Sequence, residues 1–163
     1  MAAARHSTRT AAPANRSSFT EFVERFPDEE SCLAYLWTTR CAPDGESALC
    51  PKCEDVRTFK RYDTTQPRQS WTCTTCGQHI HPTAGTIFQK SSTSLHLWFY
   101  ALYIMATTGS GVSAKQLERE LGVTYKTAWR MFHLFRDHLM TADRPGEQPM
   151  FEQLLLRAAR SRP

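Results

Sequence analysis

The sequence predicts an α+β protein in which N-terminal helices precede a small four-cysteine β-hairpin module and a helix-turn-helix bundle. Apolar residues recur at helical spacing before residue 40 and after residue 95. Short β-prone segments lie between two C-x-x-C pairs. A glycine at residue 122 separates two short amphipathic segments, as in a helix-turn-helix. Together these patterns predict five parts along the chain.

The first two parts are a disordered basic tail over residues 1–17 and a helical segment over residues 18–48. The tail contains arginines but no acidic residue, a composition that a transit peptide would share. Ser18 with Glu21 three residues later predicts a capped helix start. Pro27 then predicts a break before a second helix, and "CAPDGESAL" at its end predicts a loop over residues 41–49.

The third part, residues 49–90, is predicted to be a zinc ribbon. Its four cysteines are spaced Cys50-x2-Cys53-x19-Cys73-x2-Cys76, and "VRTFKRY" and "RQSWT" between the pairs predict a hairpin that brings them together. Zinc prefers four such ligands in a tetrahedron, so we expect one structural Zn²⁺ ion. Redox dithiols would require a βαβ context, and two matched pairs disfavour unrelated buried cysteines.

His79 and His81 lie close to these cysteines but are surplus as metal ligands. Four thiolates leave no open position for water, so the site is predicted to be structural rather than catalytic. We expect the two histidines to serve at the surface, in packing or in a phosphate contact. Cys32 and Cys41 are interpreted as a buried thiol and a loop thiol.

The fourth part, residues 91–140, is predicted to hold the helix-turn-helix. The segment from Leu95 to Ala106 is apolar nearly all round, so other elements must cover it on more than one side. Ser113 caps a short helix that Gly122 ends, and Thr124 caps the next one. Residues 141–163 are expected to be a loosely structured tail with a frayed final helix at "MFEQLLLRAAR".

The second helix of the pair has two different faces. By the helical period, Ala128, Met131, Phe132, Phe135 and Leu139 cluster on one side. Lys126, Arg130 and His133 fall opposite, with Tyr125 and Trp129 at the flank. The first turns of a recognition helix reach base edges, so this helix is a candidate DNA contact. Periodicity alone leaves an ordinary exposed helix pair equally open.

The charge distribution and the hydropathy of the sequence indicate which partners and which cellular environment to expect for the protein. Residues 17–49 carry two arginines and seven acidic residues, whereas residues 50–90 carry six basic and three acidic residues. The net charge of +4 is a weak indication of nucleic-acid binding. No apolar run reaches the roughly 18–20 residues of a membrane helix, and no signal-peptide core is present. We therefore expect a cytoplasmic protein with reduced cysteines and no membrane contact.

Several motifs occur in one order: "FPDEESCLAYLW", "CPKC", "WTCTTCG", "TAGTIF" with "LHLWFYALYIMA", and "GVSAKQLERELGVTYKTAWRMFHLFR". Over about residues 19–140 this order resembles the N-terminal region of bacterial insertion-sequence transposases with a zinc ribbon. In that family, the ribbon and a helix-turn-helix precede a ribonuclease-H-like catalytic domain with an acidic triad. The resemblance implies that the four paired cysteines bind zinc and that the region Thr124–Arg130 contacts DNA.

The chain departs from the family after Met140, where the catalytic domain is expected to begin. The tail offers only Asp143, Glu147 and Glu152, and such a short segment cannot build the rigid two-metal carboxylate scaffold that strand transfer needs. We therefore expect a truncated transposase without enzymatic activity. A separately encoded catalytic part is a possible partner, and the sequence leaves the oligomeric state open.

The resemblance and the missing carboxylate scaffold together predict that the chain recognises mobile-element DNA without catalysing strand transfer. The expected DNA contacts in the helix-turn-helix are Thr124, Tyr125, Lys126, Thr127, Trp129 and Arg130. Those expected in the ribbon are Lys52, Lys60, Arg61 and Arg68, which would contact phosphates. Two alternatives remain. One is a zinc-ribbon protein-binding adaptor or a transcription-type regulator, and the other is an enzyme using metal-bound water or a cysteine nucleophile.

Overall fold

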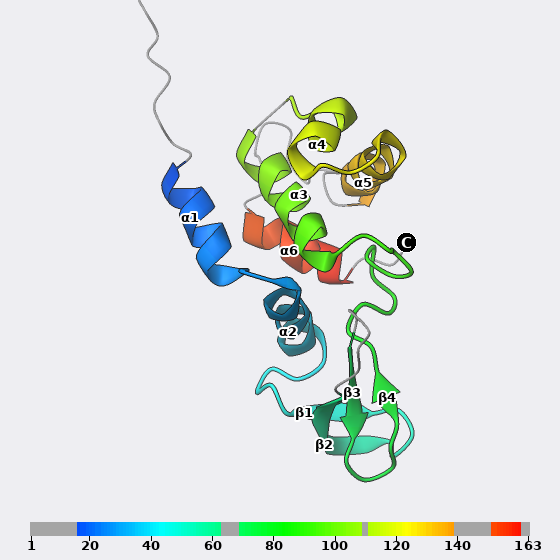
Figure 1. The fold of residues 1–163 in the computed structure, drawn as a ribbon. Coiled ribbons are helices and arrows are strands. Elements are labelled where there is room, and N and C mark those ends of the chain that lie inside the picture. The colour runs from blue at the N-terminus through cyan, green and yellow to red at the C-terminus, as the bar shows by residue number, and fades with distance from the viewer. Residues whose placement is uncertain (1–15, 63–68, 109–110, 139–150, 161–163) are drawn as a thin grey trace, which may run out of the picture.

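The computed structural model describes residues 16–62, 69–108, 111–138 and 151–160, and it confirms the α+β class (Figure 1). The helices are α1 (Arg16–Arg25), α2 (Glu29–Arg40), α3 (Leu95–Thr108), α4 (Ala114–Leu121), α5 (Tyr125–His138) and α6 (Phe151–Arg160). The strands are β1 (Ser47–Cys50), β2 (Asp55–Tyr62), β3 (Ser70–Cys73) and β4 (His79–Ile80). The sheet lies at one end of the molecule and α3–α6 at the other, with α2 between them (Figure 1).

The sheet is antiparallel in the order β1-β2-β3-β4. The long strand β2 pairs with β1 through its first half, Asp55–Thr58, and with β3 through its second half, Phe59–Tyr62. The predicted hairpin of β2 and β3 is confirmed. The loop expected over residues 41–49 is wrong for residues 47–49, because β1 gains its partner from β2, and turn residues nearby do not reveal that pairing.

Helix α3 forms the centre of the helical end. Eight of its residues are buried: Leu95, Trp98, Phe99, Ala101, Leu102, Tyr103, Ile104 and Met105. The helix contacts α2 before it in the sequence and α4, α5 and α6 after it. The prediction that this apolar segment is covered on more than one side is therefore confirmed.

Helix α6 packs against α3 and α2, and its apolar side is fully buried. Leu154, Leu155, Ala158 and Ala159 are each 0% exposed. These residues lie within the stretch that we expected to be a frayed helix in a loosely structured tail, but they complete the core instead. Sequence reasoning could not locate this partner because the face that α6 covers belongs to helices distant in the sequence. Residues 141–150 lie outside the described part of the chain.

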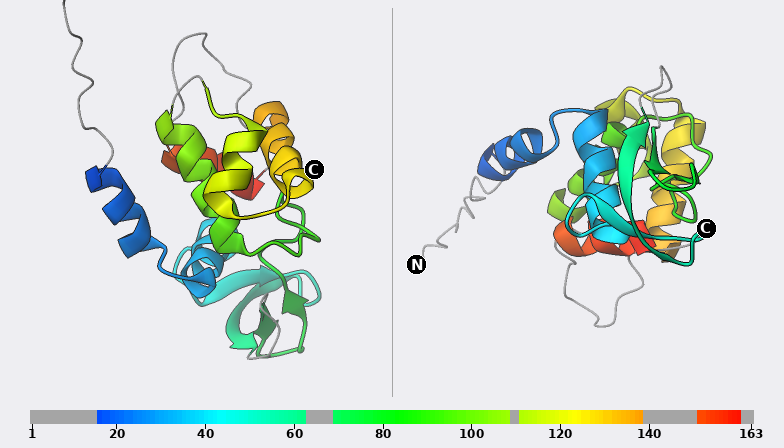
Figure 2. Two further views of the ribbon diagram at one scale, coloured as in Figure 1. Left: turned by 45° about the horizontal axis from the view of Figure 1, so that its top comes forward. Right: turned by 90° about the horizontal axis from the view of Figure 1, so that it is seen from below.

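Helix α1 projects from the rest of the molecule (Figure 2). It contacts α3 through aromatic side chains. Phe22 is buried, and its ring stacks on Tyr103 with the ring centroids 5.1 Å apart. The helix begins at Arg16, two residues before the expected cap at Ser18. Most of the predicted N-terminal tail, residues 1–15, lies outside the described residues.

Helix α2 joins the two ends of the molecule. Near its C-terminus, Trp37 is buried and stacks on Trp71 of β3, with ring centroids 4.7 Å apart and planes 9° apart. On another side of the helix, Tyr35 meets Phe99 of α3 edge to face, with centroids 5.9 Å apart. Arg40 donates hydrogen bonds to the carbonyl oxygens of Pro82 and Ala84, which fixes the loop after the sheet.

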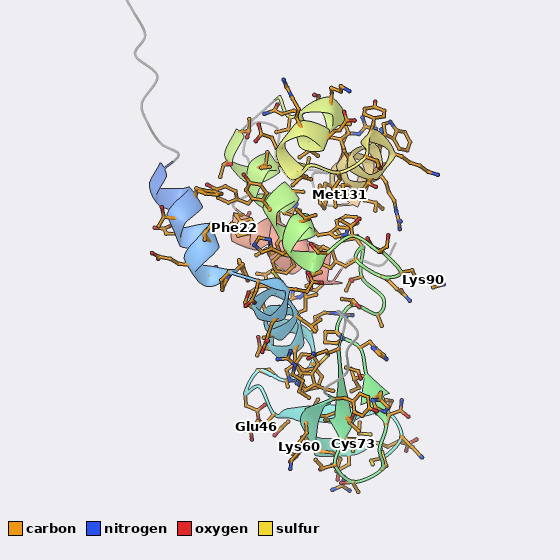
Figure 3. All side chains as sticks on the ribbon, in the orientation of Figure 1. Phe22, Glu46, Lys60, Cys73, Lys90 and Met131 are labelled. Atoms are coloured by element: carbon orange, nitrogen blue, oxygen red, sulfur yellow. The ribbon has the colours of Figure 1, made fainter. Side chains whose placement is uncertain are left out.

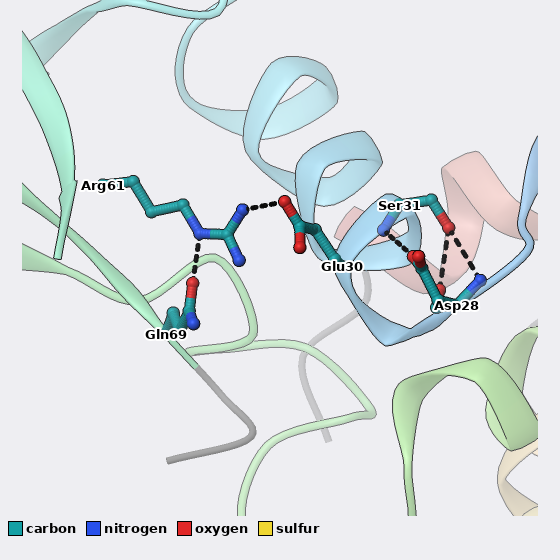
Figure 4. A network of polar contacts seen from close by, with 5 residues as sticks. All are labelled: Asp28, Glu30, Ser31, Arg61 and Gln69. Carbon is teal, nitrogen blue, oxygen red and sulfur yellow. Dashed lines mark hydrogen bonds and ion pairs between the residues drawn. The ribbon is translucent and has the colours of Figure 1, made fainter. Parts of the chain in front are cut away.

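The start of α2 carries a capping box and an ion pair with the sheet (Figure 4). The Ser31 backbone N–H donates to the Asp28 carboxylate, and the Asp28 N–H donates to the Ser31 hydroxyl. Glu30 pairs with Arg61 of β2, which also donates to Gln69. Residues about 30 positions apart are thus connected, and α2 is held at both ends.

Asp28 is expected to give α2 a pH-dependent contribution to stability. Hydrogen bonds from Ser31, first from its backbone N–H, lower the pKa of the Asp28 carboxyl below its usual value. A carboxyl with a lowered folded pKa stabilises the fold at neutral pH and loses that effect as the pH falls below about 4. The stability advantage of wild type over Asp28→Asn, which keeps a capping side chain, should shrink in thermal unfolding below that pH. An advantage independent of pH would contradict the assignment.

Candidate metal centre and nucleic-acid interface

Four cysteines converge at one end of the sheet. Cys50 ends β1 and Cys73 ends β3, while Cys53 and Cys76 lie in the turns that follow these strands. The four Sγ atoms all lie within 4.8 Å of one another, and those of Cys50 and Cys76 are 3.5 Å apart. The predicted grouping of the two pairs is therefore confirmed, and Figure 3 shows Cys73 within the sheet end of the molecule.

The two C-x-x-C turns have the same construction. In each turn the residue after the second cysteine donates its N–H to the carbonyl of the first cysteine: Glu54 to Cys50 at 2.9 Å and Gly77 to Cys73 at 3.0 Å. Both donors have left-handed backbones, with φ of 55° at Glu54 and 72° at Gly77. Gly77 suits this geometry, since glycine takes positive φ without steric cost. The repeated turn presents both thiol pairs to one point.

The dimensions of this cluster fit a metal ion. In a tetrahedral site with metal–sulfur distances of about 2.3 Å, the sulfur atoms are about 3.8 Å apart. Sulfur separations of at most 4.8 Å need little adjustment to reach that arrangement. Cys50 and Cys73 are buried, and Cys53 and Cys76 are partly buried, so the ion would be shielded on one side. Soft thiolates of this kind bind zinc, copper(I) or iron–sulfur centres rather than hard cations.

The close approach of the four thiols shifts the pKa values of Cys53 and Cys73 in opposite directions when no cation is bound. Hydrogen bonding with Cys76, followed by burial, raises the pKa of Cys53 to about 12. At Cys73, burial favours the neutral thiol, but backbone N–H groups of Cys76 and Thr75 outweigh it and bring the pKa to about 6. Four thiolates cannot all be charged this close together without a cation. A bound metal ion would supply that compensation.

The two histidines near the cluster and the two remaining cysteines are not part of the candidate metal site. His79 Nδ1 lies 3.1 Å from the Ser70 hydroxyl and 3.0 Å from that of Thr72, and its ring packs edge to face on Tyr62. His81 is exposed, and neither histidine belongs to the cysteine cluster. Cys32 and Cys41 also lie apart from it. Burial raises the pKa of the Cys32 thiol to about 12 and raises that of Cys41 as well, so both thiols stay protonated at neutral pH.

Helices α4 and α5 form the expected pair of helices joined by a short turn. The Ser113 hydroxyl accepts the Gln116 N–H at the start of α4, and Gly122 ends the helix with φ of 64°. Thr124 precedes α5, and its hydroxyl lies 3.0 Å from that of Thr127. The apolar side of α5 is buried at Ala128, Met131 and Phe135, whereas Phe132 is only partly buried. Leu139 lies outside the described residues.

The opposite side of α5 combines cations with exposed aromatic rings. Lys126 and Arg130 are exposed, and no carboxylate in the described part of the chain forms an ion pair with either. Tyr125 and Trp129 are each 49% exposed. The Trp129 ring lies against His133, with centroids 4.0 Å apart. This arrangement presents unpaired positive charge next to flat apolar surfaces.

The ribbon residues that are predicted to contact phosphates differ in whether their charge is already paired within the described part of the chain. Lys52 and Lys60 are exposed, and Figure 3 labels Lys60 on the sheet. Arg61 is instead engaged inside the chain by Glu30 and Gln69, so its guanidinium holds α2 to the sheet. Arg68 lies outside the described residues. The exposed lysines are therefore the stronger candidates in this part of the chain.

Sequence reasoning missed a cleft of about 340 Å³ between residues 90–93 and the first turns of α5. Its lining includes Lys90, Ser91, Trp98, Lys126, Trp129 and Arg130. Residues 89–94 form a polar stretch that precedes α3 in the sequence. Their polarity was visible in the sequence, but the packing that brings them beside α5 was not.

Comparisons with known proteins give one distant relative. No protein-family model and no solved structure matches the chain. A protein of Halobacterium salinarum, described as "Uncharacterized protein in transposable element ISH50", is 30% identical over 86 residues. The match covers 53% of this chain and 28% of that protein, so the chain spans less than a third of its relative. Within the described residues, no helix has the length and hydropathy needed to cross a membrane.

Proposed function

We propose that this chain is the DNA-binding portion of a transposable-element protein, in which a zinc-stabilised ribbon supports a helix-turn-helix. The observation that carries this proposal is the exposed side of α5, where Lys126 and Arg130 have no described carboxylate partner and lie beside two half-exposed aromatic rings. The similarity to a protein of an insertion element supports the association with mobile DNA.

Zinc is the metal that the cysteine cluster suits best. Four thiolates in a small β module, two of them buried, match the closed tetrahedral coordination of structural zinc. The ligands would be Cys50, Cys53, Cys73 and Cys76, and the ion would fix the two turns relative to each other. No ligand position would remain open for water, so the ion would serve folding rather than catalysis.

DNA contact would involve two sets of residues. On α5, Thr124, Tyr125, Lys126, Thr127, Trp129 and Arg130 would meet the groove, with base edges read by the first turns of the helix. On the ribbon, Lys52 and Lys60 would contact phosphates, which fix orientation but carry no sequence information. The buried side of α5 would hold the helix against α3 while its other side meets the duplex.

We propose that this chain alone does not cut or join DNA. Strand transfer of the acidic-triad kind requires carboxylates that hold two metal ions on a rigid scaffold. Among the described residues, the cluster of possible metal ligands consists of four cysteines and contains no carboxylate. A partner that supplies the catalytic part would then be required for transposition. Cleavage of duplex DNA by the purified chain with Mg²⁺ would overturn this proposal.

The test of DNA recognition is a double variant on α5, Lys126→Ala/Arg130→Ala. We expect its affinity for duplex DNA to fall about tenfold or more, and the slope of log affinity against log salt to become shallower by about 1–2. The matched control, Arg25→Ala/Arg136→Ala, removes the same number of exposed cations from α1 and from later in α5. Equal losses in both double variants would remove the role assigned to the recognition helix.

A protein-binding adaptor is the second candidate, favoured by apolar side chains exposed on the ribbon. Leu49 and Val56 face each other across β1 and β2, yet they are 65% and 60% exposed. Exposed apolar side chains that lie together, as these two do, are typical of a surface that contacts a partner when they form part of a larger patch. If the metal-loaded chain binds no DNA at low salt, this candidate would replace the first.

A further inference from the structure

We propose that the cleft between residues 90–93 and α5 binds one unpaired nucleotide of the DNA, with its phosphate at Lys90 and Ser91 and its base against Trp129. This inference rests on the proposed DNA-binding function and adds a second mode of contact to it. The cleft, at about 340 Å³, falls within the roughly 300–1,000 Å³ range of ligand pockets.

The electrostatics of the cleft favour an anion. Lys90, Lys126 and Arg130 all line it, and none of the described residues in its lining is acidic. No described carboxylate forms an ion pair with any of the three cations. Like charges gathered at a concave site repel one another, and an anion between them relieves that repulsion. A phosphodiester supplies such an anion.

Ser91 is prepared to donate a hydrogen bond into this site. Its hydroxyl oxygen accepts the Nε1–H of buried Trp98 at 3.0 Å and the backbone N–H of Thr93 at 3.2 Å. A serine hydroxyl has two acceptor lone pairs and one donor proton. With both lone pairs in use, the proton remains for an acceptor such as a phosphate oxygen. Trp98 holds the serine in place, since its ring is packed against Phe88 and Phe135.

Lys90 has a backbone conformation that is unfavourable for a residue other than glycine. Its φ is 56°, in the left-handed region that glycine enters without steric cost and other residues seldom adopt. The lysine lies on the loop between the ribbon and α3 and is exposed (Figure 3). A residue with an unfavourable backbone at a cleft is a reason to look for a role of its side chain. Here that role is the charge beside Ser91.

Trp129 supplies a surface for a base. It is 49% exposed, whereas the other three tryptophans, Trp37, Trp71 and Trp98, are at most 7% exposed. Exposed aromatic rings beside cations are the usual platform for unpaired bases, because every base has a π face. In a duplex these faces are covered by neighbouring base pairs. The combination of an anion site and an exposed indole in one cleft therefore fits an unpaired nucleotide better than a paired one.

The experiment compares two probes of the same sequence: a blunt duplex, and that duplex with a single-stranded thymidine tail. The quantity measured is the ratio of the two affinities, obtained by fluorescence anisotropy for each variant. For wild type we expect the tail to raise affinity about tenfold, from base stacking. Because Trp129 is the exposed tryptophan, the tail should also quench intrinsic fluorescence more than the blunt duplex does.

The variants are Lys90→Asn and Trp129→Leu, and the control is Arg25→Asn on α1, an exposed cation that has no assigned DNA contact. Asparagine tolerates the left-handed backbone, so Lys90→Asn should keep the fold, which thermal unfolding verifies. We expect both cleft variants to bring the ratio close to one and the control to leave it as in wild type.

A tail that adds nothing to wild-type affinity, or a ratio unchanged in both cleft variants, would overturn the inference while leaving duplex recognition intact. Binding of the tailed probe alone would support the cleft and contradict the duplex proposal, and binding of neither probe would overturn both.

Discussion

Replacing Cys73 by serine is expected to abolish metal binding and unfold the ribbon. Cys73 is buried at the end of β3, and its sulfur lies within 4.8 Å of the other three. A four-stranded sheet with strands of two to eight residues buries too little apolar surface to fold alone. Structural zinc typically contributes about 10–16 kcal/mol of apparent binding free energy, which exceeds the stability of many whole domains. Loss of one ligand should therefore remove the module.

Metal content and near-ultraviolet circular dichroism measure this effect together. Wild type should hold about one zinc ion per chain, and chelation should remove the signal of the stacked Trp37–Trp71 pair along with the metal. The matched control is Cys41→Ser, because Cys41 is partly buried but lies outside the cysteine cluster. The control should keep its metal. Unchanged thermal unfolding and dichroism after chelation would contradict the structural role of the ion.

Replacing Trp37 by alanine is expected to lower the free energy of unfolding by about 3–5 kcal/mol. Trp37 is 2% exposed, stacks on Trp71, and packs against Phe59 with ring centroids 5.6 Å apart. Its Nε1–H donates to the carbonyl of Gly45 at 2.8 Å. Alanine would leave a cavity between α2 and the sheet and a carbonyl without its donor, so both the packing and the polar contact are lost.

Urea unfolding of Trp37→Ala and Trp37→Phe separates these two effects. Phenylalanine keeps a ring in the interface but removes the hydrogen bond, so it should cost less than alanine. A double-mutant cycle with Trp71→Ala then gives the coupling between the stacked rings. A loss of less than about 1 kcal/mol in Trp37→Ala, which is typical of an arbitrary point mutation, would show that the ribbon does not depend on α2.

The parts of the fold that the sequence predicted are those with local signals. The spacing of Cys50, Cys53, Cys73 and Cys76 and the strand segments between them predicted the ribbon, since a hairpin is a contact between neighbours in the chain. Ser113 and Gly122 marked the ends of α4 because capping is also local. The nearly uniform apolar character of α3 correctly predicted cover on more than one side, although not which elements supply it.

The parts that escaped prediction depend on partners far away in the chain. Strand β1 forms its backbone hydrogen bonds with β2. Helix α6 packs against α2 and α3, and its residues Leu154 and Leu155 are fully buried. Arg61 forms an ion pair with Glu30, whereas its positive charge in the sequence predicted a contact with phosphate. The cleft beside α5 combines Lys90 with Trp129, about 40 positions later, and no periodic pattern reports that proximity.

The most direct test of the central claim is a titration of labelled duplex DNA with the metal-loaded chain at increasing salt. A protein that neutralises phosphates releases counterions, so log affinity should fall linearly with log salt concentration. We predict binding at low salt with a slope that corresponds to several phosphate contacts. The absence of any binding at the lowest salt concentration, by a chain that holds its metal and is folded, would contradict the account.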